Sequence, residues 1–215
     1  MSKAIKIVIA EDHELVRAGL IAVLNNHDQI EVIGEAIDGL EALERVRTLE
    51  PDILMLDLSM PKMGGLSVFQ QMKRRYKDTH VIILTAAENI LIWHELIELG
   101  VSGLLNKSVQ PNVMIDCVET VAKGNNFIQP EIQHTLNQVP DLTNKRLSVR
   151  EKQVVKLVAE GMKTKEIAEC LDISDRTVSK HRENVMTKMG ANSTAEIISY
   201  ANEIGLNKVD VDEIE

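Results

Sequence analysis

The chain has 215 residues, of which 44% are hydrophobic and only 2% aromatic, and its formal net charge is −9. This length allows one large or two modest domains with packed aliphatic cores, and the scarcity of aromatic rings argues against nucleic-acid binding by base stacking. No apolar stretch reaches the length of a membrane span and no signal-peptide layout opens the chain, so we expect a cytoplasmic protein with no membrane partner. The two cysteines, Cys117 and Cys170, lack the spacing of a metal site and fit a reducing compartment.

Short apolar runs alternate with helical patterns through residues 1–124. Runs rich in Ile, Val and Leu are typical of strands buried on both faces, and the intervening helices make the sheet parallel and doubly wound. We therefore predict an α/β domain over 1–124 with a five-stranded parallel sheet. The expected strands are 5–10, 30–36, 52–57, 80–85 and 102–106, and the expected helices are 13–26, 38–48, 64–75, 88–99 and 110–123.

Polar and turn-forming residues dominate after Gly124 and predict a linker over 125–144, with a short amphipathic helix near 131–138. From Leu147 the start and stop signals of helices return and predict a small all-α domain of four helices over 145–207. An acidic tail over 208–215 is expected to be disordered. The expected helix N-caps are Ser148, Thr164, Ser174 and Ser193, and the expected helix ends are Gly161, Gly190 and Gly205.

The net charge hides an uneven distribution along the chain. Residues 1–144 carry 12 Lys and Arg against 20 Asp and Glu, whereas residues 145–188 carry 11 against 7. Residues 189–215 are acidic again, with 1 against 6. An acidic first domain joined to a locally basic segment is the asymmetry expected when the second domain binds DNA.

Five polar residues stand where four apolar runs of the first domain end: Glu11, Asp12, Asp57, Thr85 and Lys107. The carboxyl ends of parallel strands gather along one edge of a sheet, so these side chains are expected to meet there. Three carboxylates repel one another unless a cation lies among them. A Mg²⁺ ion held by carboxylates and water fits that charge and leaves positions open for a phosphoryl group. Each residue alone has an ordinary interpretation, such as helix capping by Asp12 or Asp57, and only their joint occurrence indicates a site.

Four motifs give this half of the chain a family resemblance. They are Ile-Ala-Glu11-Asp12-His13, Asp57-Leu-Ser-Met-Pro61-Lys-Met-Gly-Gly65, Leu84-Thr85-Ala86 and Gly103-Leu-Leu-Asn-Lys107. Over residues 4–123 they resemble the receiver domain of bacterial response regulators, which implies a flavodoxin-like fold.

The resemblance implies a role for most of these residues. Asp57 matches the aspartate that accepts a phosphoryl group from a sensor histidine kinase. Glu11 and Asp12 match the acidic pair that helps to hold Mg²⁺, together with the Asp57 side chain and the backbone carbonyl of Ser59. Lys107 matches the lysine that pairs with the phosphoryl oxygens. Phosphoryl transfer needs positioning and charge neutralisation, which such a set supplies.

The switch positions depart from the family pattern. Thr85 matches the hydroxyl residue that moves toward the phosphoryl group. Receivers usually carry an aromatic residue three positions before the lysine, but Leu104 stands there, so coupling of hydroxyl movement to ring rotation cannot operate in that form. The helix expected at 88–99 also has more apolar positions than one buried stripe needs. We expect it to pack against the linker or the second domain, or to form a partner or dimer surface, and we hypothesise that activation works through its packing.

Residues 165–182 have the spacing of a helix-turn-helix. Two short helices meet at a turn through Asp172 and Ile173, and the side chains expected between them are Ile167, Ala168, Leu171, Ile173 and Val178. Polar and basic residues then remain available for DNA. The candidates are Lys165, Arg182 and Lys188 toward phosphates, Ser179, Lys180 and Glu183 toward base edges, and Ser174, Arg176 and Thr177 at the start of the second helix.

The full segment is more specific than a bare helix pair. Over residues 145–206 it resembles the LuxR-type helix-turn-helix domain, through Leu147-Ser-Val-Arg-Glu151, Thr164-Lys-Glu-Ile-Ala168, Leu171-Asp-Ile-Ser174, His181-Arg-Glu-Asn184 and Lys188-Met-Gly190. A receiver followed by this domain resembles the NarL/FixJ subfamily of two-component response regulators. The resemblance implies that helix 175–189 enters the DNA major groove and that helix 194–204 carries contacts of an active homodimer.

We therefore expect a transcription factor whose binding to double-stranded promoter DNA follows phosphorylation at Asp57, with Mg²⁺ as cofactor and a cognate sensor histidine kinase as partner. Two other functions stay open at this point. One is a DNA-binding regulator that works without phosphorylation, whose receiver is a protein-interaction module. The other is an aspartyl-phosphate phosphatase, although such an enzyme would want a second acid two residues after Asp57, where Ser59 stands.

Overall fold

A computed structural model describes residues 4–86, 89–138, 147–203 and 206, and the chain divides into two compact units, Met1–Gln138 and Val139–Glu215. The acidic tail predicted over 208–215, the helix end predicted at Gly205 and the second part of the predicted linker lie outside the described residues. No helix in the described ranges is both long enough and apolar enough to cross a membrane.

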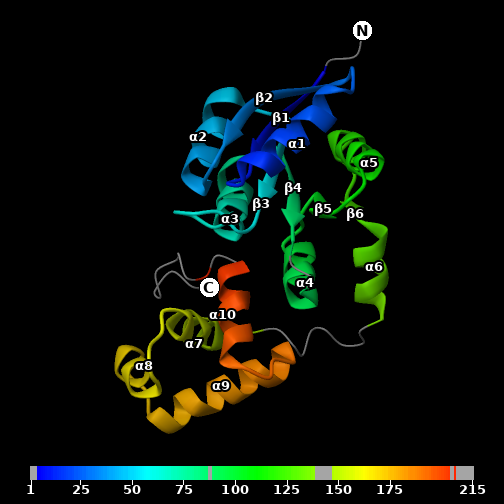
Figure 1. The fold of residues 1–215 in the computed structure, drawn as a ribbon. Helices are drawn as coiled ribbons and strands as arrows, with labels where there is room; N and C mark the ends of the chain where they lie inside the picture. The colour runs from blue at the N-terminus through cyan, green and yellow to red at the C-terminus, as the bar shows by residue number, and fades with distance from the viewer. Residues whose placement is uncertain (1–3, 87–88, 139–146, 204–205, 207–215) are drawn as a thin grey trace. The chain divides into compact units, whose positions relative to one another are not determined.

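The first unit is built on one parallel sheet in the strand order β2-β1-β3-β4-β5-β6 (Figure 1). β1 (Ile5–Ala10), β2 (Ile30–Ala36), β3 (Ile53–Asp57), β4 (His80–Thr85) and β5 (Gly103–Asn106) confirm the five predicted strands. The predicted number of strands is wrong, because a sixth strand, β6 (Phe127–Ile128), pairs with β5. The strand order reverses between β1 and β3, and such a switch point is where open α/β sheets bind ligands.

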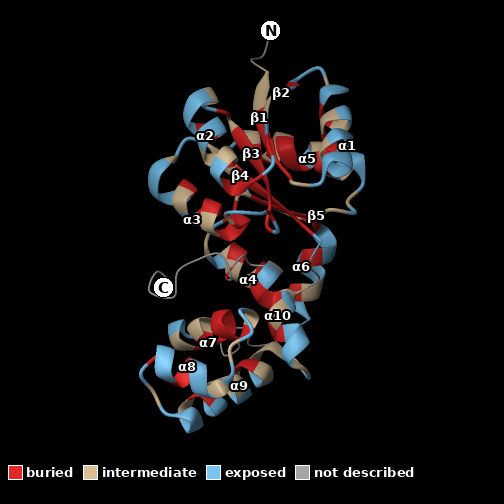
Figure 2. Ribbon diagram, turned by 60° about the vertical axis from the view of Figure 1, so that its left-hand side comes forward, coloured by how far each residue is buried: buried red, intermediate tan, exposed pale blue. Residues whose placement is uncertain are grey.

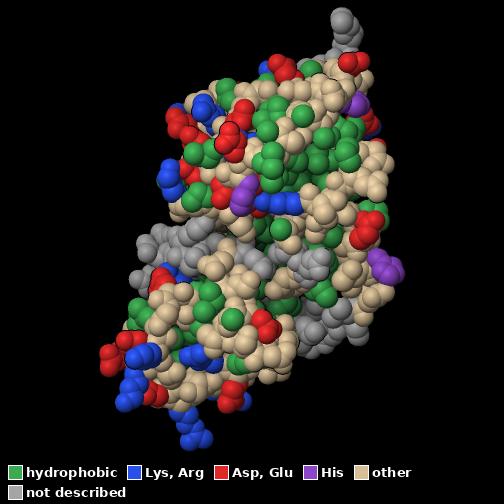
Figure 3. Space-filling model, viewed as in Figure 1, with side chains coloured by type: hydrophobic (Ala, Val, Ile, Leu, Met, Phe, Trp, Pro, Cys, Tyr) green, Lys and Arg blue, Asp and Glu red, His purple; other side chains and the backbone are tan. Residues whose placement is uncertain are grey.

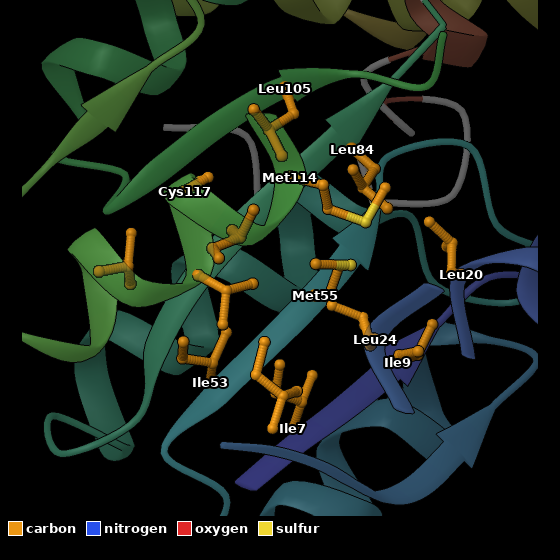
Figure 4. Close-up of a cluster of buried hydrophobic side chains, with 14 residues drawn as sticks. Ile7, Ile9, Leu20, Leu24, Ile53, Met55, Leu84, Leu105, Met114 and Cys117 are labelled. Atoms are coloured by element: carbon orange, nitrogen blue, oxygen red, sulfur yellow. The ribbon is translucent and has the colours of Figure 1, made fainter. Parts of the chain in front are cut away.

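Helices cover both faces of this sheet. α1 (Glu14–Asn25) and α5 (Pro111–Ala122) lie on one face, and α2 (Gly39–Leu49) and α3 (Gly65–Arg75) lie on the other (Figure 1). Figure 4 shows the core under α1 and α5, where strand residues such as Ile7 and Met55 meet Leu24 and Cys117. Burial raises the pKa of the Cys117 thiol to about 12, so this cysteine acts as a small core hydrophobe. The central strands are buried along almost their whole length (Figure 2), as their apolar composition predicts.

The turn after β3 brings α3 close to Asp57. The backbone N–H of Gly65 donates to the carbonyl of Leu58 at 2.9 Å. A Cβ atom at Gly65 would lie 2.1 Å from the carbonyl oxygen of Asp57, so glycine is required for this approach. Asp38, buried at the start of α2, accepts from the backbone N–H of Glu41 and pairs with Lys62 at 2.5 Å. The loop after Asp57 is thereby tied to the neighbouring βα turn.

The first unit extends beyond the predicted boundary at 124. The predicted linker begins instead with β6 and continues into α6 (Pro130–Asn137), which confirms the short helix expected near 131–138. α6 buries Ile132 and Leu136 and packs beside α4 (Ile90–Glu98) (Figure 1). The excess of apolar residues in α4 is therefore explained in part by packing against a segment that we assigned to the linker.

Gln129 fastens this extension to β5. Its backbone N–H donates to the carbonyl of Leu104 at 3.0 Å, and its side-chain Oε1 accepts from the backbone N–H of Asn106 at 2.8 Å. Because this side chain is buried, its amide oxygen takes the place of a water molecule as the acceptor for an N–H at the edge of β5. One residue thus completes the hydrogen bonding of the strand that leads to Lys107.

Replacing Gln129 by Ala is expected to lower the free energy of unfolding of the first unit by about 1–3 kcal/mol, because the N–H of half-buried Asn106 loses its acceptor. Urea unfolding of the full chain measures this. The control is Gln133→Ala, whose exposed amide bonds to Asn137 on the same helix, and which is expected to change stability by less than about 0.5 kcal/mol. Equal unfolding midpoints for the two variants would contradict this account of Gln129.

The second unit contains the four predicted helices: α7 (Val149–Ala159), α8 (Thr164–Cys170), α9 (Asp175–Met189) and α10 (Thr194–Glu203). Ser148 and Glu151 form the predicted capping box, and Ser174 Oγ accepts from the backbone N–H of Thr177 at 3.1 Å. The prediction of Thr164 as a cap is wrong. Thr164 is already the first helical residue, and the N-cap is Lys163, whose N–H donates to the carboxylate of Glu166.

A charged pair joins α7 to the end of α9. The buried carboxylate of Glu151 accepts from the backbone N–H of Ser148 at 2.8 Å and pairs with the ammonium of Lys188 at 2.6 Å. Burial raises the pKa of the Glu151 carboxyl, but the hydrogen bonds from Lys188 and Ser148 outweigh burial, and the net pKa lies below its ordinary value. Ionised Glu151 therefore stabilises the folded second unit.

The variant Glu151→Gln is expected to destabilise the second unit by about 1–3 kcal/mol at pH 7, since the ammonium of Lys188 loses its charged partner. Because the pKa of Glu151 is depressed by folding, its contribution is fully present above the ordinary carboxyl pKa. It disappears as the pH falls through the lower, folded value. Thermal unfolding at a series of pH values should show wild type and variant converging in acid. A stability difference that stays constant down to the acid limit would contradict this assignment.

Candidate functional site

The structure brings the predicted residues together at the carboxyl edge of the sheet in the first unit. Glu11 directly follows β1 and Asp57 ends β3, and both side chains are buried. Lys107 directly follows β5, and its ammonium lies 2.7 Å from Glu11 Oε2 and 2.9 Å from Asp57 Oδ2. Side chains more than 90 residues apart in sequence thus form one charged cluster because their strands end at the same edge.

Electrostatics at this cluster disfavour two ionised acids. Burial raises the pKa of the Asp57 carboxyl, and the negative charge of Glu11 raises it further. The Lys107 ammonium lowers this pKa, but not enough to cancel the rise. Burial also acts to lower the pKa of Lys107, but the Asp57 and Glu11 carboxylates outweigh it, and the net pKa is raised. The Lys107 side chain is therefore protonated. Its single positive charge faces the two carboxyl groups of Glu11 and Asp57.

Thr85 lies beside this cluster, at the end of β4. Its side chain is buried, and its backbone carbonyl accepts from the N–H of Lys107 at 2.9 Å. Thr85 is also paired in register with Asn106 of β5. A change at Thr85 would therefore reach the backbone of Lys107 directly.

Asp12 and Ser59 complete the predicted set. Asp12 follows Glu11 and its carboxylate Oδ1 lies 2.8 Å from Nδ1 of His13. Ser59 lies on the exposed loop after β3, and its backbone N–H donates to the Asp57 carboxylate. This bond favours the ionised form of Asp57 and fixes the loop close to the site.

The acidic side chains fit a divalent cation. Donor atoms of Glu11, Asp12, His13 and Asp57 all lie within 4.8 Å of one another. The buried oxygens Glu11 Oε2 and Asp57 Oδ2 share one ammonium, that of Lys107, and Asp12 adds a third carboxylate. One ammonium leaves three clustered carboxylates short of positive charge, which favours a further cation among them. This donor set matches the oxygen ligands that Mg²⁺ prefers, with room for water.

His13 is the member of the cluster to which the sequence interpretation gave no role. Its Nδ1 contacts Asp12 and lies 3.1 Å from Glu11 Oε1, although the side chain is 67% exposed. The hydrogen bond to Glu11, with the added charge of Asp12, raises the pKa of the His13 imidazole. The only sequence signal was its position directly after the acidic pair, which by itself is also that of an ordinary helix N-cap.

Leu104 occupies the atypical switch position in the interior of the sheet. It is fully buried in β5, between Ile83 of β4 and Ile128 of β6. A residue paired on both sides and excluded from solvent cannot swing between an exposed and a buried position as a surface ring can. The leucine at this usually aromatic position therefore occurs together with an additional strand, β6, which covers the edge of β5.

The candidate DNA-binding residues lie on α8 and α9 of the second unit. Ile167, Ala168, Leu171 and Val178 are buried between these helices, as predicted, and Ile173 is half-buried. Figure 3 shows Lys and Arg side chains on the surface that these helices form. The candidates that are exposed are Lys165, Ser174, Arg176, Ser179, Lys180 and Glu183, and those that are half-buried are Thr177, Arg182 and Lys188.

Several of these side chains already have partners within the unit. Lys180 pairs with Glu183 at 3.3 Å, and Arg182 donates to the hydroxyl of Thr194 at 3.3 Å. Lys188 pairs with buried Glu151, which gives it a structural role in addition to any contact with phosphate. Lys163, which was not among the candidates, is exposed at the start of α8, two residues before Lys165.

Two family models match the two units. The response regulator receiver domain matches residues 7–119, and the luxR family of bacterial regulatory proteins matches residues 145–201. The transcriptional regulatory protein YdfI of Bacillus subtilis strain 168 is 36% identical over 211 aligned residues, and the match covers 95% of this chain and 99% of that protein. The oxygen regulatory protein NreC of Staphylococcus carnosus strain TM300 is 35% identical over 208 aligned residues, and the match covers 91% of this chain and 96% of that protein.

Solved structures of RcsB are similar to this chain as well. RcsB from Salmonella enterica serovar Typhimurium bound to the promoter P1flhDC with the phosphomimetic BeF3- has a TM-score of 0.73 and 28% identity, covering 94% of this chain and 100% of that chain. A structure of two RcsB dimers bound to two parallel DNAs has a TM-score of 0.71 and 27% identity, with the same coverage.

Proposed function

The chain belongs to the two-component response regulators that join a receiver domain to a LuxR-type DNA-binding domain, and we propose that Asp57 is its phosphorylation site. In this proposal Asp57 accepts a phosphoryl group from a cognate sensor histidine kinase, and the phosphorylated receiver shifts dimerisation and domain contacts toward promoter DNA binding. One observation carries the proposal. The ammonium of Lys107 lies 2.9 Å from the buried Asp57 carboxylate and 2.7 Å from Glu11, at the ends of neighbouring strands.

The transfer itself needs little more than position and charge. A carboxylate oxygen of Asp57 forms a bond to phosphorus while the bond from phosphorus to the kinase imidazole nitrogen breaks. The imidazole leaves with the electron pair and takes up a proton. Glu11, Asp12, the Asp57 side chain and the carbonyl of Ser59 would hold a Mg²⁺ ion, which supplies charge neutralisation at the phosphoryl oxygens. Lys107 supplies a second positive charge from the protein side.

Signal output starts at Thr85 and Lys107 in this proposal. A phosphoryl group adds strong acceptor oxygens, and the Thr85 hydroxyl and the Lys107 ammonium are the donors at hand. The Lys107 N–H is bonded to the carbonyl of Thr85, so a movement of Thr85 would be passed on to Lys107. β5 then connects Lys107 to Gln129 and the start of α6 through hydrogen bonds, which supports a route for the signal that does not need an aromatic ring at Leu104.

A surface for the kinase is supported by the start of α1. Leu15 is 87% exposed and Val16 is 37% exposed, directly after His13 and the acidic pair. Large apolar side chains in the open beside a reactive group are typical of a protein-interaction surface. We propose that the kinase domain that presents the phosphoryl group to Asp57 contacts these residues.

DNA binding is assigned to α9. Ser179, Lys180 and Glu183 lie on its exposed side, with Arg176 at its first turn, and this side would enter the major groove and read base edges. Lys165 and Arg182 would contact phosphates. α10 buries Ile197 and Tyr200 against its own unit, and its outer side would carry the dimer contacts that place two α9 helices on half-sites about one DNA turn apart.

One observation favours a second function, that of a DNA-binding regulator that works without phosphorylation. Leu104 is locked inside the sheet, so the ring rotation that usually accompanies receiver activation has no counterpart here. In that case the receiver would act as a protein-interaction module. For an aspartyl-phosphate phosphatase the second acid is lacking at Ser59, and we do not propose that activity.

Intact-mass spectrometry of the full chain after incubation with acetyl phosphate and Mg²⁺ tests the proposal. We expect the mass of one phosphoryl group, added at Asp57 and removed by hydroxylamine, which cleaves acyl phosphates. A chain that gains no mass with acetyl phosphate, and none with a kinase partner, would support the phosphorylation-independent function instead.

A further inference from the structure

The loop between Asp57 and α3 is held in a conformation that its own sequence does not favour. Lys62, in the middle of this loop, has φ +60°, a left-handed backbone that residues with a Cβ atom rarely adopt. Such strained residues persist only where the surrounding structure holds them, and they cluster at functional sites. Contacts around Lys62 must therefore offset the strain.

Two contacts join this loop to the start of α2. The ammonium of Lys62 lies 2.5 Å from Oδ2 of Asp38, whose side chain is only 2% exposed. On the next loop residue, the backbone of Met63 packs directly on Gly39, where a Cβ atom would lie 2.3 Å from the Met63 carbonyl oxygen. We call these two contacts, Lys62 with Asp38 and Met63 with Gly39, the loop latch.

The α2 side of the loop latch is fixed by the helix itself. Oδ1 of Asp38 accepts from the backbone N–H of Glu41 at 2.9 Å and caps α2, which leaves Oδ2 for Lys62. Burial acts to raise the pKa of the Asp38 carboxyl, but the hydrogen bonds from Lys62 and Glu41 outweigh burial, and the net pKa is lowered. A buried, ionised carboxylate needs a cationic partner, so Lys62 is drawn to one point at the start of α2.

The loop latch lies three residues after Ser59, the loop residue that bonds to Asp57. The N–H of Ser59 donates to the Asp57 carboxylate, and the proposed function assigns the Ser59 carbonyl to Mg²⁺. Leu58 and Met60, on either side of Ser59, are buried, so the short path from Lys62 back to Ser59 has little freedom. A contact that fixes Lys62 therefore also restricts Ser59.

We propose that the loop latch is a positioning device for the metal site, which holds the carbonyl of Ser59 where that carbonyl can bind Mg²⁺. The inference rests on the proposed function, which supplies the ion and the role of Ser59. A ligand that is already in place loses less conformational freedom when the ion binds. The loop latch thus raises the affinity for Mg²⁺ although its own side chains do not contact the ion.

Titration calorimetry of the full chain with MgCl₂ tests this through Lys62→Met, which removes the ammonium and keeps a long side chain. We expect Mg²⁺ to bind roughly three- to tenfold more weakly, at or below the lower end of what losing an outer-shell partner costs, because Lys62 acts through the loop. Simple electrostatics predicts the opposite sign, since removing a positive charge from this loop would tighten the binding of a cation. The matched control is Lys123→Met, an exposed, ion-paired lysine at the end of α5, which should keep the affinity within about twofold.

Two further variants leave the net charge unchanged. Lys62→Arg keeps the pairing with Asp38 and should bind Mg²⁺ within about twofold of the wild type. Gly39→Ala places a methyl group against the backbone of Met63 and should weaken Mg²⁺ binding as Lys62→Met does. Hydrogen exchange of the Ser59 amide, measured by NMR without metal, should be faster in Lys62→Met and Gly39→Ala than in the wild type. The same spectra show whether each variant keeps the native fold.

Two results would overturn the proposal. One is an affinity of Lys62→Met for Mg²⁺ that equals or exceeds that of Lys123→Met. The other is a rate of Ser59 amide exchange that is unchanged in both Lys62→Met and Gly39→Ala. Failure of the wild type to gain a phosphoryl group from acetyl phosphate would instead count against the proposed function. The amide exchange of Ser59 needs neither metal nor phosphate and would still decide whether the loop latch holds this residue.

Discussion

The Asp57→Asn variant is expected to accept no phosphoryl group from acetyl phosphate or from a sensor kinase, because an amide cannot form the acyl phosphate. Intact-mass spectrometry under conditions that modify the wild type fully should show an unmodified variant. Asp78→Asn is the matched control, since Asp78 is exposed on the loop before β4, away from the predicted set, and should leave phosphorylation unchanged. Modification of Asp57→Asn to the wild-type extent would remove Asp57 from the proposal.

The same variant is expected to be more stable than the wild type in the absence of metal. Burial, with the nearby charge of Glu11, raises the pKa of the Asp57 carboxyl. A carboxyl whose pKa is raised by folding costs stability when it is ionised, above its ordinary pKa, and this cost disappears at lower pH. The neutral amide of Asp57→Asn removes the cost. Thermal unfolding in EDTA at pH 7 should therefore show a higher Tm for Asp57→Asn, and the difference should shrink toward pH 4. A lower Tm for the variant at pH 7 would contradict this electrostatic description.

The second large effect is expected on α9. Replacing Lys180 by Ala should weaken binding to a cognate promoter by about 1–3 kcal/mol if the lysine reads a base edge. Arg182→Ala should instead weaken binding to all DNA sequences and reduce the slope of log K against log salt by about 0.9, which is the share of one phosphate contact. Fluorescence anisotropy with promoter and unrelated duplexes at several salt concentrations separates the two effects.

Charge-matched controls make this test specific. Lys123→Ala removes the same charge from an exposed position at the end of α5 and should change neither affinity nor salt slope. Lys188→Ala should mainly lower the stability of the second unit, because Lys188 pairs with buried Glu151. If Lys180→Ala binds the promoter as tightly as Lys123→Ala does, α9 does not read DNA through this residue.

Much of the architecture was predictable because the signals are local. Alternating apolar runs and helical patterns gave β1, β2 and β4 to the residue, and Ser148 and Ser174 cap helices as their sequence context indicates. The cluster of Glu11, Asp57 and Lys107 followed from topology alone, since parallel strands bring their carboxyl ends to one edge.

The errors concern features that depend on tertiary partners. β6 is only two residues long and exists because the edge of β5 offers it hydrogen bonds, so Phe127 and Ile128 carry no strand signal of their own. The burial of Gln129 and the contact of His13 with two carboxylates likewise depend on residues brought close by folding. The Thr164 cap was misassigned because the carboxylate of Glu166 bonds to the N–H of Lys163 and starts the helix there.

Contacts inside the first unit are consistent with the hypothesis that activation works through the packing of α4. α4 packs beside α6, and α6 directly follows Gln129, whose side chain bonds to the strand that leads to Lys107. A change at Asp57 thus has a continuous path of contacts to α4 and α6 inside the first unit. Such a path needs to change the relative stability of two states by only a few kcal/mol to act as a switch.

The affinity of the full chain for a cognate promoter duplex, measured with and without acetyl phosphate and Mg²⁺ on wild type and Asp57→Asn, tests the central claim most directly. We predict that phosphorylation tightens wild-type binding by roughly 5- to 150-fold, the range of a coupling of 1–3 kcal/mol, and leaves Asp57→Asn unchanged. Equal wild-type affinity in both conditions, at full occupancy of Asp57 by mass, would contradict the account.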